Sequence, residues 1–99
     1  MTKEKCLKVI SFYRQYFEKE NIPKGEVPHG VNLVYAYRLQ LHGKATMHAH
    51  GMLDQMEVFI TEGRMDKFFR WLGFVQGVLW TSGHFSLEEL KNHNRSSEE

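Results

Sequence analysis

Residues 65–80 constrain the fold more than any other stretch, because as a helix they would be apolar around well over half of its circumference. A helix of this kind must be buried on several sides, and a chain of 99 residues provides one domain in which to bury it. We therefore predict a helix over residues 64–82, either enclosed by its own chain or partly covered by another. Its apolar residues are Met65, Phe68, Phe69, Trp71, Leu72, Phe74, Val75, Val78, Leu79 and Trp80.

The residues before Pro23 predict a first helix. Cys6, Ile10, Tyr13 and Phe17 recur at helical spacing within residues 2–20. The helix should end before Pro23, since proline lacks an amide hydrogen and pushes the preceding residue out of the helical conformation. Cys6 is the single cysteine, and its place on this stripe indicates a small buried side chain rather than a nucleophile.

Glycines delimit the next predicted helix. It should follow a break at Gly43, span residues 45–62 and end at Gly63, where a left-handed cap is least costly. One face is apolar, and we expect His50, Asp54 and Glu57 on the opposite, polar face. The apolar face consists of Ala49, Met52, Leu53, Met56, Phe59 and Ile60.

The last helix has a complete start signal. Ser86 and Glu89 have the spacing of a capping box, while Phe85 and Leu90 have that of a hydrophobic staple. Gly83 should end the helix before it. The four segments predict a mainly α protein, a small three- to four-helix bundle over residues 1–95 with a polar tail at 96–99.

Residues 31–41 have two interpretations. Apolar and other residues alternate along them, which is typical of a strand, although a lone strand would need a partner from another chain. A helix would instead place Leu33, Val34, Tyr37 and Leu41 on one face. Both interpretations stay open from the sequence.

The charge pattern gives no sign of a nucleic-acid surface, because 13 basic and 12 acidic residues are interspersed. A nucleic-acid contact through the first helix is the weakest hypothesis, since Glu4, Glu18 and Glu20 interrupt its basic residues. The N-terminus does not resemble a signal peptide, and no apolar run approaches the roughly 18 residues of a membrane span, so we expect a cytoplasmic protein. The residues of the nucleic-acid hypothesis are Lys3, Lys5, Lys8 and Arg14, with Tyr13 or Tyr16 stacking on bases.

The histidines suggest a metal or small-ligand site at His48, His50, Asp54 and Glu57, with His42 nearby. Imidazole and carboxylate groups bind zinc, which would be the metal of this site. His48 and His50, however, would point to different faces of a helix, and a polar face with one histidine and two acids is typical of an ordinary solvated helix. The main prediction is therefore that the protein has no cofactor.

Catalysis has little support in the sequence. It contains no catalytic serine context, phosphate-binding glycine loop or paired-cysteine metal motif. Asp66 and Arg70 have the spacing of a surface ion pair on one helix. We predict that the protein is not an enzyme.

The apolar helix instead suggests an interface. Most of its aromatic residues fit a core, but any surplus would lie against a second copy or another protein. Gly73 and Gly77 lie one above the other on its narrow strip and would allow another backbone to approach closely. The candidate interface consists of Phe68, Trp71, Phe74, Trp80, Gly73 and Gly77.

The segment RWLGFVQGVLW, closed by LEELKNHNR, resembles a group of small uncharacterised proteins encoded by bacteriophages and prophages. The resemblance covers residues 57–95 and carries no catalytic residue. It implies a phage accessory protein that binds a host or phage protein, for example to inhibit a defence or replication complex. Together with the surplus of apolar residues, it predicts a non-catalytic, oligomeric, protein-binding chain.

Overall fold

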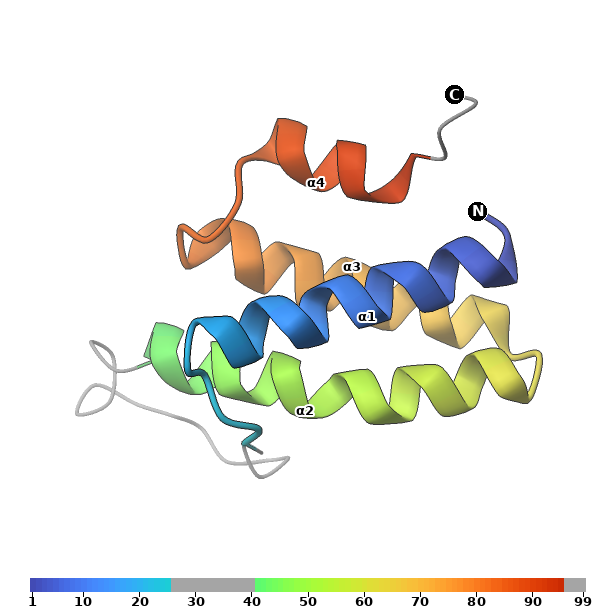
Figure 1. Ribbon diagram of the computed structural model, residues 1–99, viewed down its shortest axis with the longest axis horizontal. Coiled ribbons are helices and arrows are strands. Elements are labelled where there is room, and N and C mark those ends of the chain that lie inside the picture. The colour runs from blue at the N-terminus through green and yellow to red at the C-terminus, as the bar shows by residue number, and fades with distance from the viewer. Residues whose placement is uncertain (26–40, 96–99) are drawn as a thin grey trace.

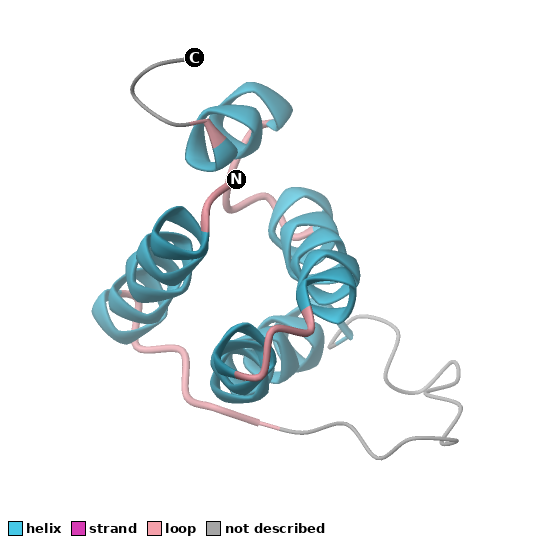
Figure 2. Ribbon diagram, turned by 90° about the vertical axis from the view of Figure 1, so that its right-hand side faces the viewer, coloured by secondary structure: helices cyan, strands magenta, loops and turns pink. Residues whose placement is uncertain are grey.

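The computed structural model describes residues 1–25 and 41–95, and describes side chains for residues 1–25 and 43–95. Within these ranges the chain forms four helices and no strand: α1 (Lys3–Lys19), α2 (Leu41–Thr61), α3 (Met65–Thr81) and α4 (Leu87–Asn94). The helix α2 packs against both α1 and α3, and the short α4 lies across α1 and α3 on the side away from α2 (Figures 1 and 2). The prediction of a small, mainly α bundle is confirmed.

Local hydrogen bonds explain most of the helix ends. The Thr2 hydroxyl accepts from the Lys5 amide at 3.0 Å and caps α1. After α2 and α3, Gly63 and Gly83 have φ angles of 75° and 77°, the left-handed conformation expected of them. Ser86 and Glu89 form the predicted capping box at the start of α4, with bonds of 3.1 and 3.0 Å.

The predicted start of α2 is wrong. The helix begins at Leu41 and runs through Gly43, where the sequence predicts a break. Gly43 is exposed with open space beside it, and a glycine inside a helix costs only about 1 kcal/mol relative to alanine, which a helix of 21 residues offsets. The remainder of the ambiguous segment, residues 31–40, lies outside the described residues, as does the predicted tail at 96–99.

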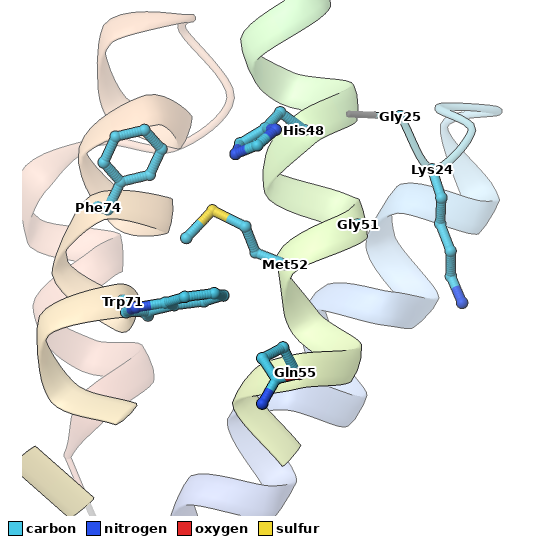
Figure 3. Close-up of a pocket in the computed structure, with 8 residues that line it drawn as sticks. All are labelled: Lys24, Gly25, His48, Gly51, Met52, Gln55, Trp71 and Phe74. Atoms are coloured by element: carbon cyan, nitrogen blue, oxygen red, sulfur yellow. The ribbon is translucent and has the colours of Figure 1, made fainter. Parts of the chain in front are cut away.

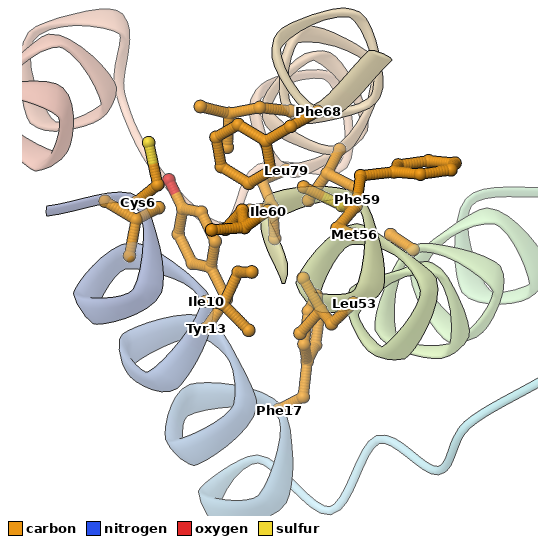
Figure 4. Close-up of a cluster of buried hydrophobic side chains, with 14 of the residues drawn as sticks. Cys6, Ile10, Tyr13, Phe17, Leu53, Met56, Phe59, Ile60, Phe68 and Leu79 are labelled. Atoms are coloured by element: carbon orange, nitrogen blue, oxygen red, sulfur yellow. The ribbon is translucent and has the colours of Figure 1, made fainter. Parts of the chain in front are cut away.

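One hydrophobic core joins the helices (Figure 4). Cys6, Ile10, Tyr13 and Phe17 are all at most 1% exposed, which confirms the predicted stripe of α1. The Cys6 thiol is enclosed in this core, and burial raises its pKa, as expected for a structural rather than a reactive cysteine. The other helices contribute Leu53, Met56, Ile60, Phe68 and Leu79, among others.

A close backbone contact fixes the segment after α1 against α2. The Gly25 amide donates to the Met47 carbonyl at 2.9 Å. A Cβ atom on Gly51 would lie 2.6 Å from the Gly25 carbonyl oxygen, closer than Cβ atoms approach other atoms in proteins. This contact therefore needs glycine at Gly51, a requirement that the sequence pattern did not reveal.

The expectation that α3 would be buried on several sides is wrong. Only Phe68, Leu72, Val75 and Leu79 are buried, and they form a single face. The neighbours of α3 cover that face and part of its two flanks, so the rest of its apolar surface remains open. Three large aromatic side chains are exposed: Phe69 by 41%, Phe74 by 54% and Trp80 by 49%.

Polar side chains attach α4 to the bundle. The Tyr13 hydroxyl lies 2.9 Å from His93 Nδ1, and Gln76 Nε2 donates to the same hydroxyl at 2.9 Å. Gln76 and Asn94 exchange two amide hydrogen bonds of 2.8 and 3.0 Å. A second bond of this kind joins the Tyr16 hydroxyl to His84 Nδ1 at 2.7 Å.

No helix in the described part of the chain is both long and apolar enough to cross a membrane.

Candidate functional site

A cavity of about 570 Å³ opens between α2 and α3, and we call it the α2–α3 groove. In Figure 3, His48, Met52 and Gln55 project from α2 toward Trp71 and Phe74 of α3. Lys24 and Gly25 lie at its other end, across α2. A cavity of this size, lined mainly by apolar groups with a few polar ones, is typical of a binding site.

The two aromatic side chains that form one wall of the groove, Trp71 and Phe74, differ in how closely they are packed. The Trp71 indole packs edge to face on Phe59, with ring centroids 4.9 Å apart and planes at 89°. Arg64 and Lys67 lie over the same Phe59 ring, at 5.4 and 5.5 Å from its centroid. Phe74 has less support, since it is half exposed and meets His48 edge to face at 6.3 Å. The wall therefore combines a fixed indole with an open phenyl ring.

The few polar groups of the groove carry little charge. His48 and Gln55 supply hydrogen-bonding groups, and no acidic residue is among the described residues that line it. The Lys24 ammonium forms a 2.9 Å ion pair with Asp54, which partly neutralises its charge. Such a surface suits an apolar side chain or a flat uncharged ligand better than an ion.

The structure does not bring the predicted metal ligands together. His48 lines the groove beside α3, whereas His50 faces α1 and stacks on Phe17 with ring centroids 4.8 Å apart. The prediction of His50 on a polar face is wrong, since this side chain is only 4% exposed. The reason is that α1 packs against that flank of α2 and covers it.

The two acidic members of the predicted metal set bind arginine. Arg14 contacts Asp54 at 3.0 Å and Glu57 at 2.6 Å. Hydrogen bonds from Lys24 and Arg14 lower the pKa of Asp54. Burial acts to lower the pKa of Arg14, but its bonds to Glu57 and Asp54 outweigh this and leave the pKa raised. The carboxylates thus join α1 to α2.

One polar atom of His50 has no partner among the described residues. Its Nδ1 donates to the Ile22 carbonyl at 2.8 Å, and its Nε2 is a buried atom to which no described residue hydrogen-bonds. An isolated imidazole nitrogen does not make a metal site, and the described residues contain no group of three or more potential ligands. The side chain of His42 lies outside the described part of the chain.

The predicted interface residues fall into three groups. The prediction of Phe68 as an interface residue is wrong, since this side chain is fully buried in the core. Trp71 and Phe74 line the α2–α3 groove, while Trp80 lies on the opposite flank of α3, beside α4. Gly73 and Gly77 are exposed between these flanks, and apart from their chain neighbours and the surrounding backbone of α3, no described atom would lie within 4 Å of a Cβ on either. The predicted close backbone approach does not occur within the described chain.

The nucleic-acid hypothesis loses two of its groups. Tyr13 is completely buried and cannot stack on a base, and Arg14 is engaged by Asp54 and Glu57. The predicted surface pair of Asp66 and Arg70 is present at 3.8 Å, with both side chains largely exposed.

Gln55 lines the groove without having been predicted as a site residue. Its spacing from His48 and Met52, seven and three residues, places all three on one helical face and could have revealed it.

Comparison with protein-family models, with curated proteins and with solved structures found no match to this chain.

Proposed function

We propose that the chain is a non-catalytic binding protein that uses the exposed side of α3 and the adjoining α2–α3 groove to hold another protein. The observation that carries the proposal is the exposure of Phe74 and Trp80, 54% and 49%, on a helix whose other face forms the core. Large aromatic side chains are enriched where proteins bind each other, and leaving them in water costs the free energy of their burial.

The shape of this surface supports the same function. The groove beside Trp71 and Phe74 can accept an apolar side chain, and buried aromatic anchors of this kind carry much of the affinity at interfaces. Gly73 and Gly77 lie between the two aromatic flanks without a Cβ to keep a partner at a distance. A second copy of the chain could use the same surface, and we propose that the protein is a homo-oligomer.

The biological setting in this proposal comes from the resemblance of residues 57–95 to small phage-encoded proteins. On that basis the bound protein belongs to the host or the phage, such as a component of a defence or replication complex in the host cytoplasm. Among the described residues that line the groove, none is a serine, threonine or cysteine that His48 could activate as a nucleophile; the other polar groups are Gln55 and the ion-paired Lys24.

Substitutions on α3 test the proposal. Tagged protein incubated with host lysate should retain a partner that is depleted at least tenfold by Phe74→Gln or Trp80→Gln. Leu7→Gln is the matched control, because Leu7 is 41% exposed on α1, away from α3. Sedimentation velocity on the same proteins should give a concentration-dependent oligomer that only the α3 substitutions weaken. A monomeric wild type, together with a partner retained equally by all variants, would contradict the proposal.

A second candidate function is the binding of a small flat ligand in the groove, favoured by the cavity of about 570 Å³ beside His48 and Trp71. Of the predicted metal set, only His48 lines this cavity. Quenching of tryptophan fluorescence by an aromatic probe should then be lost in Phe74→Gln, while Leu7→Gln quenches normally. Elemental analysis and zinc titration test the metal alternative, for which an unchanged melting temperature would be adverse.

A further inference from the structure

A second cavity lies on the α1–α4 side of the bundle, apart from the α2–α3 groove. It measures about 360 Å³, within the range of small-ligand sites. Two turns of α1 and the last turn of α4 form it, so α4 has to be in place for the cavity to exist. Its lining residues are Lys5, Lys8, Val9, Phe12, Asn92 and His93.

The wall of this cavity that α1 contributes is basic. Lys5 and Lys8 project from the same face of α1, and none of the described lining residues is acidic. Glu4 approaches the Lys8 ammonium at 3.6 Å, but both side chains are at least 70% exposed, so the pair neutralises little. The Arg95 guanidinium donates to the side-chain oxygen of the lining residue Asn92 at 3.0 Å.

The imidazole of His93 is oriented by the core. Because Gln76 Nε2 donates to the Tyr13 hydroxyl, that hydroxyl directs its own hydrogen to His93 Nδ1. The ring proton therefore resides on Nε2, the nitrogen that the core does not use. Burial lowers the pKa of His93; Glu89 on its own helix opposes this effect, and Lys5 on α1 adds to it. At neutral pH, His93 is thus a fixed, uncharged donor.

The floor of the cavity is apolar. Val9 is buried, and the Phe12 ring lies 4.7 Å from the His93 ring while remaining 45% exposed. A half-exposed phenyl ring beside two lysines and an oriented N–H group provides an apolar contact next to a set of anion donors. This combination distinguishes the cavity from a simple basic patch on the surface.

We propose that this cavity binds a small organic anion, in which a phosphate or carboxylate group is carried on a flat apolar body. The oxyanion would lie among the ammonium groups of Lys5 and Lys8 and the Nε2–H of His93. The apolar body would rest on Val9 and Phe12. The site is independent of the protein-binding surface proposed for α3 and of its test.

Titration with phenyl phosphate, followed by the NMR resonances of His93 and Phe12, tests this site. Phenyl phosphate should shift these resonances saturably and raise the pKa of His93, since a bound anion favours the imidazolium. Benzoate, tested in parallel, distinguishes the two oxyanions, and binding of either supports the proposal. Phenol supplies the same apolar body without charge and should bind at least tenfold more weakly.

Three lysines of α1 provide the variants for this experiment. Lys5→Gln and Lys8→Gln should each weaken phenyl phosphate binding by about five- to tenfold, the loss of one charge-assisted hydrogen bond partly screened by solvent. Lys19→Gln, near the C-terminal end of α1, removes the same charge away from the cavity and should leave binding unchanged. The inference is overturned if neither anion shifts His93, if phenol binds as well, or if all three lysine variants behave alike.

Discussion

Because Gly51 contacts Gly25 closely, replacing Gly51 by alanine should destabilise the protein, whereas the same replacement at the open position Gly77 should stabilise it. In Gly51→Ala the new Cβ would lie 2.6 Å from the Gly25 carbonyl oxygen, whereas ordinary van der Waals contact begins near 3.4 Å. The backbone at Gly25 would have to move away, because no flexible side chain can yield. That movement would also strain the 2.9 Å hydrogen bond from the Gly25 amide to Met47.

The expected free-energy change follows from three contributions. Alanine gains about 1 kcal/mol over glycine within a helix. Overpacking costs about 1–3 kcal/mol, and weakening the hydrogen bond costs about 0.5–1.5 kcal/mol. With each contribution at the middle of its range, we therefore expect Gly51→Ala to lower the free energy of unfolding by about 2 kcal/mol.

Gly77→Ala is the matched control, because Gly77 is also in the middle of a helix but has open space around it. This variant should gain stability, by about 0.5–1 kcal/mol. Urea denaturation of both variants should place their midpoints on opposite sides of the wild type. Melting temperatures should differ by about 10–20 °C, at about 4–8 °C per kcal/mol for a domain of this size. If Gly51→Ala stabilises the protein as much as Gly77→Ala, the close approach of Gly25 to α2 is refuted.

Three further predictions concern α4 and the network that attaches it. The pKa of His93 is lowered in the folded state, so the contribution of the neutral imidazole to stability is present above the unfolded pKa of about 6.5 and is lost as the pH falls. The urea midpoint should therefore drop between about pH 7.5 and 5.5, and the drop should be smaller in His93→Gln. Burial raises the pKa of Tyr13 to about 12. Its contribution, on the order of 2–3 kcal/mol, is therefore complete below pH 10 and lost as the pH rises toward 12, and Tyr13→Phe should remove the latest phenolate transition from an ultraviolet titration. Ser86→Ala breaks the capping box and should cost about 1 kcal/mol; hydrogen exchange should accelerate in α4, and unchanged exchange there would contradict this role of the cap.

The sequence predicted the candidate sites less well than the helices. Of the four residues in the predicted metal set, only His48 lines the α2–α3 groove, because Asp54 and Glu57 bind Arg14 and His50 is covered by α1. A polar face seen in one helix does not reveal which neighbour will pack against its edge. The cavity beside His93 was also missed, since it depends on α4 folding back onto α1.

What the sequence determined by itself was the set of helices and most of their ends. The stripe of α1, the glycines after α2 and α3, and the Ser86 cap depend on residues a few positions apart, and their hydrogen bonds and periodicity are local. Tertiary structure decided which flank of each helix was covered. Tyr13 meets Gln76 and His93 across 63 and 80 residues of chain, and Gly51 of α2 meets Gly25 of the segment that follows α1. Helical periodicity indicates only that a face is apolar. Which neighbour covers that face depends on how the described helices pack, and so does the aromatic surface of α3 that they leave open.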